Sequence, residues 1–248
     1  MKFDAKGTSL KNLENLKEFK ETYKFLEELE NQGINISARL GLELLHSKNL
    51  FDENYIISDG ALEAYAKTSN VNFKDLIDSG FITPQSSILD LGGNYGYLDM
   101  VLSERFECEC FVVDEDPLVI KLGKLIKQDW FSLSKERLDI KYMEGDAFKL
   151  NFNRTVDYTI ISNVISSFRK DPDFGSDIGL VNLPSLSPNI FVNSKNLIVH
   201  LPRGNNFLKR SEEYYESQIE NMFDVWGKGA PQRYKDWIIF HKPNMLII

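Results

Sequence analysis

The sequence is poor in the residues that mark secreted, metal-binding and membrane proteins. Two of its 248 residues are cysteine and three are histidine, and no Cys-rich or His/Glu set has the spacing of metal ligands. No apolar run approaches the roughly 20 residues of a membrane span. The N-terminal residues lack the apolar stretch of a secretory signal. We therefore expect a cytoplasmic protein with no metal and no membrane association.

Blocks of consecutive basic residues are also missing, and the formal net charge is −8. A surface that binds duplex nucleic acid needs clustered Lys and Arg to replace counterions. A nucleic-acid partner is therefore disfavoured, although a local basic patch stays open. We expect a small-molecule partner, and a homodimer remains an open alternative.

The two cysteines, Cys108 and Cys110, lie two apart at the start of a predicted strand. Side chains two apart on a strand point to one face, and an extended backbone holds them too far apart to bridge easily. We expect free thiols, as is usual in a reducing compartment.

Helical patterns dominate the first 84 residues. In the first helix, apolar residues recur at steps of three and four from Leu13 to Leu29, with Thr8 or Ser9 as cap and Gly33 after its end. We expect residues 1–84 to be a helical lid or cap, and residues 85–248 to be a ligand-binding domain. The predicted helices are Ser9–Asn31, Ile36–His46, Gly60–Lys67 and Phe73–Ser79.

After Pro84, short apolar strands alternate with helices, which predicts an α/β fold with a mostly parallel sheet covered on both faces. The chain closes with a predicted antiparallel hairpin whose turn holds Pro243 and Asn244. The predicted strands are Ser87–Leu91, Glu107–Asp114, Asp139–Met143, Asp157–Ser162, Asn196–Leu201, Trp237–His241 and Met245–Ile248. The predicted helices are Tyr97–Arg105, Pro117–Gln128 and Leu208–Trp226.

The most informative stretch is Ser87–Tyr97, in which a strand ends in Asp90 and a glycine-rich turn follows. Glycine adopts positive φ and lets a ligand approach the backbone closely. Asn94 stands at the centre of the turn, and asparagine is the residue that best tolerates the left-handed region after glycine. Tight turns of this kind also occur for packing alone.

Later strands end in residues that extend this pattern. Asp114 follows the turn by about twenty residues, a spacing at which an acid accepts both hydroxyls of a ribose. The alternative is that Asp114 to Asp116 only cap the helix that starts at Pro117. Gly145-Asp146-Ala147 follows the next strand, and Ser162-Asn163 ends the one after it.

In this order and spacing, these elements resemble the class I S-adenosylmethionine-dependent methyltransferases. The resemblance covers about residues 87–248 and implies a Rossmann-like, seven-stranded sheet and S-adenosylmethionine as cofactor. It implies that Asp90 approaches the methionine amino group, Asp146 accepts from the adenine amine and Ser162 lies near the methyl group. The implied cofactor-binding residues are Asp90, Gly92, Gly93, Asn94, Gly96, Asp114, Glu115, Asp146, Ala147 and Ser162.

Two rival nucleotide sites are disfavoured, because the turn fits neither the Gly-x-Gly-x-x-Gly of nicotinamide sites nor a P-loop. The Pro-Pro motif of base N-methylating enzymes is missing after Asn163. On the acceptor side we expect Asn163 and His200, with His200 at a strand end and titrating near neutral pH as a general base. A structural histidine is the alternative reading.

A narrower resemblance is carried by Gly92-Gly93-Asn94-Tyr95-Gly96-Tyr97-Leu98, which is similar to the turn of sugar O-methyltransferases of bacterial surface-polysaccharide clusters. It implies O-methylation of a sugar or another small polar metabolite. N-methylation of an amine or peptide, and a non-catalytic cofactor-binding interaction protein, remain open.

Overall fold

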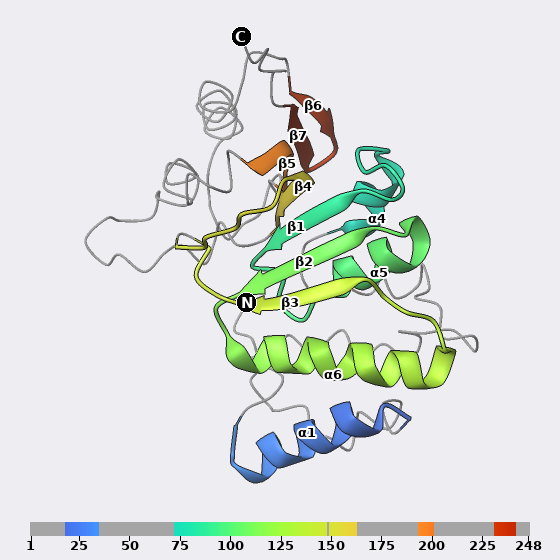
Figure 1. The fold of residues 1–248 in the computed structure, drawn as a ribbon, viewed down its shortest axis with the longest axis vertical. Helices are drawn as coiled ribbons and strands as arrows, with labels where there is room; N and C mark the ends of the chain where they lie inside the picture. Colours follow the sequence, from blue (N-terminus) through green and yellow to red (C-terminus); the bar gives the residue numbers. More distant parts are fainter. Residues whose placement is uncertain (1–17, 35–71, 148, 163–192, 201–230, 242–248) are drawn as a thin grey trace.

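The computed structural model describes residues 18–34, 72–147, 149–162, 193–200 and 231–241. Its centre is a seven-stranded sheet with the order β3-β2-β1-β4-β5-β7-β6 (Figure 1). Neighbouring strands from β3 to β5 pair in parallel, and β7 pairs antiparallel with both β5 and β6. The strands are β1 (Ser87–Leu91), β2 (Glu109–Asp114), β3 (Ile140–Glu144), β4 (Val156–Ile161), β5 (Ser194–His200), β6 (Gln232–Tyr234) and β7 (Trp237–His241). The predicted α/β architecture with a mostly parallel sheet is confirmed.

Both faces of the sheet are buried, because alternate side chains of each strand enter different clusters. Ile88 and Ile160 pack with the helices, whereas Leu89 and Ile161 enter the cluster on the other face. This two-sided burial explains why the strands read as continuous apolar runs. The described helices are α1 (Lys20–Asn31), α4 (Phe73–Asp78), α5 (Tyr97–Phe106) and α6 (Pro117–Ser134).

Helices α5 and α6 connect β1 to β2 and β2 to β3, and right-handed crossovers place both on one face of the sheet. Helix α6 runs six residues beyond the predicted end at Gln128, to a left-handed cap at Lys135 (φ 64°). Cys108 and Cys110 lie buried on this face as free thiols, as predicted.

Helix α1 begins at Lys20, so the prediction of one helix running from Ser9 is wrong for residues 18 and 19, which form a turn and a bend. Its N-cap residue, Phe19, gives no side-chain hydrogen bond. The cap comes instead from Asp129 on α6, whose carboxylate accepts from the backbone N–H groups of Glu21 and Thr22. The predicted caps Thr8 and Ser9 lie outside the described residues.

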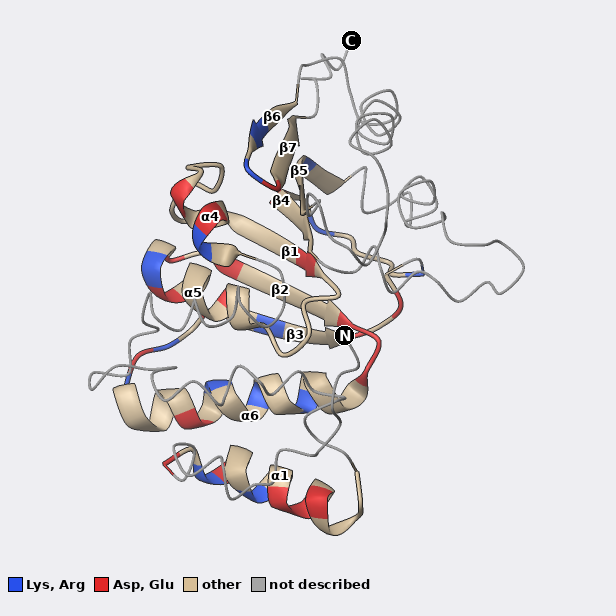
Figure 2. Ribbon diagram, turned by 180° about the vertical axis from the view of Figure 1, so that it is seen from behind, with Lys and Arg blue, Asp and Glu red and all other residues tan. Residues whose placement is uncertain are grey.

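Helix α1 packs along α6 (Figure 2). Besides the contact of Thr22 with Asp129 near the end of α6, the ammonium of Lys121, nearer its start, lies 4.3 Å from the centre of the Phe25 ring. The two helices are therefore antiparallel, and α1 runs toward the sheet edge at which α6 begins.

Helix α4 packs into the same hydrophobic core as α1, α5 and α6. Its N-cap Asn72 accepts through its side chain from Asp75 N, and its backbone oxygen accepts from Trp237 Nε1 at 3.0 Å. Phe73 and Leu76 are buried in the cluster that also holds α1, α5 and α6. The described parts of residues 1–84 therefore share one hydrophobic core with the sheet.

The terminal hairpin differs from its prediction. The partner of β7 is β6, joined to it by a turn at Lys235 and Asp236, and β5 occupies the other edge of β7. The predicted antiparallel pair near the C-terminus is confirmed, but in the described structure it is formed by β7 with β6, a strand that the sequence did not predict. The sequence lacks a Gly or Pro between β6 and β7, and Lys235 takes the positive φ (52°) itself.

Four predicted elements lie outside the described residues. They are Ile36–His46, Gly60–Lys67, Leu208–Trp226 and Met245–Ile248.

Candidate cofactor site

The predicted site residues gather at one edge of the sheet, because the parallel strands β1 to β5 all end there. Asp90 lies near the end of β1 and Asp114 ends β2. Gly145 follows β3, Ser162 follows β4 and His200 ends β5. Open α/β sheets bind their ligands at this carboxyl edge.

The glycine-rich turn has the left-handed residues that its sequence predicts. Gly92, Asn94 and Gly96 have φ values of 71°, 54° and 79°. The side-chain oxygen of Asn94 accepts from the N–H of Tyr95 at 2.8 Å, a local bond that offsets the strain of its backbone. At Gly93 an added Cβ would lie 2.8 Å from Asp90 Oδ2, so only glycine fits. Asn94 is thus a workable replacement for glycine, whereas Gly93 is not replaceable.

Asp114 links this turn to the loops after β2 and β3. Its Oδ2 accepts from the N–H of Asn94 at 3.0 Å, and its Oδ1 accepts from the N–H of Asp116 at 2.9 Å. Its backbone oxygen accepts from the N–H of Gly145 at 2.9 Å. Burial raises the pKa of Asp114, partly offset by these backbone donors. Three separately predicted elements are therefore hydrogen-bonded to one residue.

The helix-capping role belongs to Asp116 rather than to Asp114. Asp116 is the N-cap of α6, with Pro117 at the first helical position, and its Oδ1 accepts from the N–H of Leu118 at 2.9 Å. The Asp114 carboxylate instead bonds to the glycine-rich turn through the N–H of Asn94. It therefore lies at the carboxyl edge of the sheet, where a ligand is expected to bind.

Beneath the turn, Asp90 faces a second buried acid that the sequence reading missed. Asp99, in the first turn of α5, is 0% exposed, and Asp90 is 2% exposed. Oδ1 of Asp90 and both carboxyl oxygens of Asp99 have no hydrogen-bond partner in the described structure, and the two acids interact with each other. Desolvation raises the pKa of Asp90 well above its usual value and that of Asp99 to about 6. The sequence did not indicate this role for Asp99, because an acidic residue in the first turn of a helix is common and is explained by the helix dipole.

Tyr142 of β3 is a second missed residue, and it supports the turn from below. Its hydroxyl donates to the backbone oxygen of Tyr95 at 3.0 Å. The ring fills the space left by two glycines, since an added Cβ would lie 3.0 Å from its Cε1 at Gly96 and 2.4 Å at Gly123. Gly123 was the one sequence signal for this contact, because a glycine in the middle of a helix often marks a place where another group packs closely against the helix.

The remaining predicted cofactor residues lie at the same edge with less defined contacts. Asp146 is half-buried, and its Oδ2 lies 3.3 Å from Lys149 Nζ. Ala147 packs against the cluster on the face away from the helices. Ser162 is buried, whereas Glu115 is exposed.

His200 is more buried than a freely titrating base. It is 2% exposed, its ring centre lies 4.7 Å from that of Trp237, and Nδ1 has no hydrogen-bond partner in the described part of the chain. Desolvation lowers the pKa of His200 to about 4, so the prediction that it titrates near neutral pH is wrong. The imidazole is neutral at pH 7. Its predicted companion, Asn163, lies outside the described residues.

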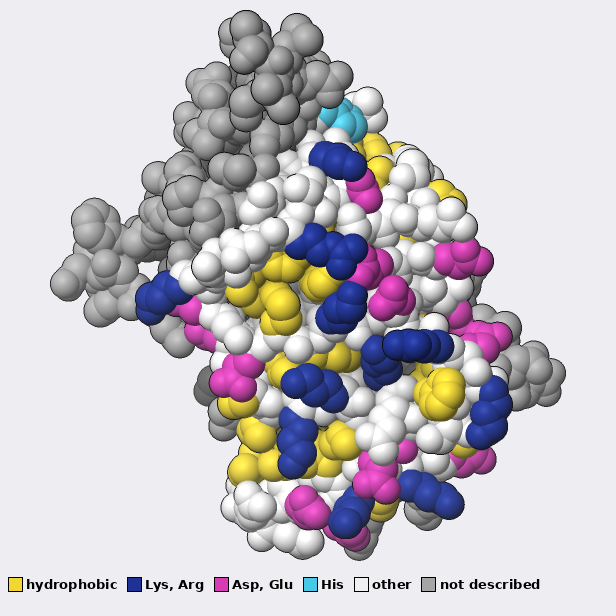
Figure 3. Space-filling view, in the orientation of Figure 1, with side chains coloured by type: hydrophobic (Ala, Val, Ile, Leu, Met, Phe, Trp, Pro, Cys, Tyr) yellow, Lys and Arg dark blue, Asp and Glu magenta, His cyan; other side chains and the backbone are white. Residues whose placement is uncertain are grey.

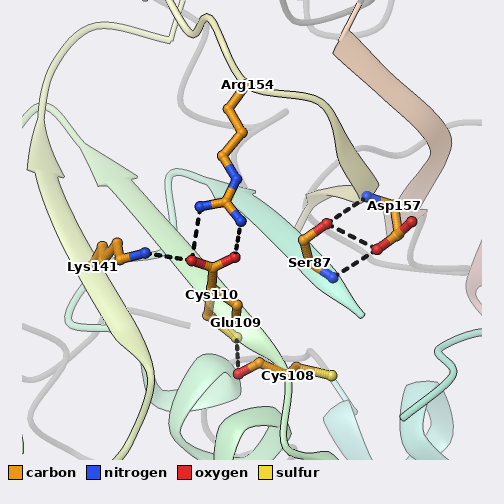
Figure 4. A network of polar contacts seen from close by, with 7 residues as sticks. All are labelled: Ser87, Cys108, Glu109, Cys110, Lys141, Arg154 and Asp157. Atoms are coloured by element: carbon orange, nitrogen blue, oxygen red, sulfur yellow. Dashed lines mark hydrogen bonds and ion pairs between the residues drawn. The ribbon is translucent and has the colours of Figure 1, made fainter. Parts of the chain in front are cut away.

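A different polar network closes the opposite, amino edge of the sheet (Figure 4). Ser87 donates to Asp157 through both N–H and Oγ, joining β1 to β4. Glu109 accepts from Lys141 and Arg154, whose cations lie over the Phe111 ring. Burial alone would raise the pKa of Glu109, but these two cations outweigh it and lower that pKa. The network ties strands together away from the turn.

On the face in Figure 3, basic side chains alternate with acidic and hydrophobic ones. Within the described ranges, no group of three or more His, Cys, Asp or Glu side chains is placed to hold a metal ion. Among the same residues, no helix combines the length and apolar character needed to cross a membrane.

No protein-family model and no curated protein sequence matches this chain. Solved structures do. The magnesium protoporphyrin IX methyltransferase of Synechocystis PCC 6803, solved with bound S-adenosylmethionine, is 11% identical with a TM-score of 0.51, over 84% of this chain and 94% of that one. Human N-acetylserotonin methyltransferase, also solved with S-adenosylmethionine, is 16% identical with a TM-score of 0.50, over 91% of this chain and 66% of that one.

A third match, YjhP of E. coli, is 15% identical, and the alignment spans 51% of this chain and less than half, 46%, of that one. Its TM-score of 0.38 is too low to support any argument. The first two matches cover 84% and 91% of this chain. The chain therefore has the fold of the class I S-adenosylmethionine-dependent methyltransferases.

Proposed function

We propose that this protein is an S-adenosylmethionine-dependent methyltransferase that O-methylates a small polar metabolite, with a sugar or nucleotide-sugar as the leading acceptor class. The observation that carries the proposal is the Asp114 carboxylate, which is bonded to the backbone of the glycine turn and lies at the carboxyl edge of the sheet. Both matched methyltransferases are named for small-molecule substrates, which supports an acceptor of that size.

The residues present fit this cofactor. A carboxylate offers about four lone-pair sites, and the backbone donors Asn94 and Asp116 use two of those on Asp114. The others remain for ribose hydroxyls. Oδ1 of Asp90 is buried without a partner in the described structure, as expected of an atom that waits for a donor such as an ammonium. Gly93 has no room for a side chain, because an added Cβ would lie 2.8 Å from Asp90 Oδ2, so glycine lets the turn pass directly over Asp90.

When bound, the cofactor supplies an electrophilic methyl group on a sulfonium. The chain holds the ribose through Asp114, the methionine amino group near Asp90 and the adenine amine near Asp146. We assign the acceptor side to Asn163 and His200. Proximity supplies much of the rate of such a displacement.

We further propose that residues 1–84 form a cap over the carboxyl edge of the sheet. Helix α1 supports it, because it runs antiparallel to α6 and so toward the edge where α6 begins beside Asp114. The buried free thiols of Cys108 and Cys110 are compatible with the reducing cytoplasm.

A second candidate is N-methylation of an amine or peptide. The low pKa of His200 favours it, because an imidazole that protonates only near pH 4 is a weak base for a hydroxyl acceptor. An uncharged amine carries its own lone pair and needs no strong base.

The experiment has two stages. Calorimetry with S-adenosylhomocysteine is expected to detect binding, and no binding would contradict both enzyme proposals. A homocysteine-release assay over a panel of sugars, nucleotide-sugars and amines then identifies the acceptor. Turnover with hydroxyl acceptors alone supports O-methylation, and turnover with amines alone favours the second candidate.

A further inference from the structure

The acids Asp90 and Asp99 are both buried, and three of their four carboxyl oxygens have no hydrogen-bond partner in the described structure. Asp90 is 2% exposed and Asp99 is 0% exposed. Oδ1 of Asp90 and both carboxyl oxygens of Asp99 receive no hydrogen bond from a donor group in the described structure. The two acids interact with each other, and each shifts the pKa of the other. Two ionised carboxylates buried together without donor groups are strongly unfavourable, so we expect one of the two acids to hold a proton.

The groups that face the pair do not offset a double negative charge. From β2 come Asp114 on the Asp90 side and Cys110, whose Sγ lies 3.7 Å from the backbone oxygen of Asp99. From β3 comes the half-buried Tyr142. None of these three carries positive charge, and among the residues that the structure describes no Lys, Arg or His shifts the pKa of either acid. Two like charges desolvated together are strongly unfavourable.

We propose that Asp90 and Asp99 share one proton in the cofactor-free protein, and that Asp99 is a positioning residue that sets the charge of Asp90 for the cofactor's ammonium group. This inference rests on the proposed function. When the ammonium approaches Asp90, it favours the ionised form of that acid. The shared proton then moves wholly onto Asp99 or leaves to solvent, and no covalent bond changes other than O–H.

The pKa shifts agree with a shared proton. Burial and the facing acid raise the pKa of Asp90 well above its usual value, and burial raises that of Asp99 to about 6. Because the acids interact, these values describe the pair rather than either residue. Because the pKa of Asp99 is raised to about 6 and that of Asp90 is also raised, we expect the pair to take up protons as the pH falls below about 6. The neutral pair attracts an ammonium poorly, so cofactor binding is expected to weaken as the pH falls.

The first test needs no ligand. Infrared spectra of the cofactor-free protein at pH 7 are expected to show the C=O stretch of a protonated carboxyl, lost in Asp99→Asn, where an amide N–H donates to an ionised Asp90. The matched control is Asp129→Asn, another buried acid, which accepts from two backbone N–H groups and is expected to leave the band unchanged. Absence of the band in the parent protein, or its persistence in Asp99→Asn, would overturn the shared proton.

The second test measures S-adenosylhomocysteine binding by calorimetry from pH 5 to pH 7, in buffers of different ionisation enthalpy. Affinity of the parent protein is expected to rise about tenfold over this range with release of protons, as linkage to about one proton requires. Asp99→Asn is expected to change less than about threefold, since only groups such as Asp114 still titrate. Identical pH profiles for the two proteins would overturn the role of Asp99.

The two failures are distinguishable. No binding to the parent protein at any pH contradicts the proposed function and, with it, the role assigned to Asp99. The infrared result still decides whether the proton is shared. Binding with equal pH profiles contradicts this inference and leaves the methyltransferase proposal standing.

Discussion

Asp129 caps a helix to which it is not joined in sequence: its Oδ2 accepts from the backbone N–H of Thr22 at 2.8 Å, across 107 positions of the chain. Its Oδ1 accepts from the neighbouring N–H of Glu21. The first N–H groups of a helix have no partner within the helix, and the positive end of the helix dipole favours a carboxylate. One side chain of α6 therefore both starts α1 and fixes its place on the domain.

Replacing Asp129 by alanine is expected to lower the free energy of unfolding by about 1–3 kcal/mol, because buried backbone N–H groups lose their acceptor. Glu27→Ala, on the exposed side of α1, is expected to change it by less than about 0.5 kcal/mol. Urea unfolding measures both. Equal effects of the two substitutions would show that the cap does not hold α1 in place.

The hydroxyl of Tyr142 is expected to matter for the ligand-binding turn. Tyr142→Phe removes the bond to the oxygen of Tyr95, a loss of about 1 kcal/mol that is expected to raise the Kd for S-adenosylhomocysteine about fivefold. The matched control is Tyr158→Phe, whose hydroxyl lies 3.3 Å from Thr83 Oγ1. Calorimetry at one pH compares the variants. A Kd that shifts equally in both would indicate general loosening of the sheet instead.

His200 is expected to make stability depend on pH. Its pKa is about 4 in the folded state against 6.5 for the free side chain, so the unfolded chain binds the proton first as the pH falls. Stability is therefore complete above pH 6.5 and is lost between pH 6.5 and 4, by about 3 kcal/mol for a shift of this size.

His200→Phe is expected to remove this part of the pH dependence, and the exposed His241→Phe is expected to keep it. Unfolding free energies at pH 7 and pH 4.5 provide the comparison. A pH dependence that His200→Phe leaves unchanged would mean that the imidazole is solvated.

The parts of the fold that were predictable depend on local pattern. Strands Ser87–Leu91 and Trp237–His241 were predicted to the residue, because apolar runs bounded by polar or turn residues leave few alternatives. Helix α6 was predicted to begin at Pro117, since the cap Asp116 and the proline are adjacent in sequence. The glycine-rich turn, Asp114 and Gly145 each follow or end a predicted parallel strand, and this order predicted that they lie at one edge of the sheet.

The parts that were not predictable depend on contacts between distant residues. Nothing near Lys20 indicates that Asp129 will cap α1, so its start was placed too early. Strand β6 was not predicted, because it has three residues and is followed by a turn without Gly or Pro. The low pKa of His200 arises from burial beside Trp237, which strand position alone does not reveal.

In the proposed site, Asp114 binds a cofactor ribose while Asp116, two residues on, only caps a helix. The most direct measurement is calorimetric titration of S-adenosylhomocysteine into the parent protein, Asp114→Ala and Asp116→Ala. We predict a loss of more than about 1 kcal/mol, or over fivefold in Kd, for Asp114→Ala, the scale of a lost charge-assisted hydrogen bond. Asp116→Ala is expected to keep the parent Kd and to lose about 1 kcal/mol of stability. Parent-like affinity in Asp114→Ala, or no binding by the parent protein, would contradict the account.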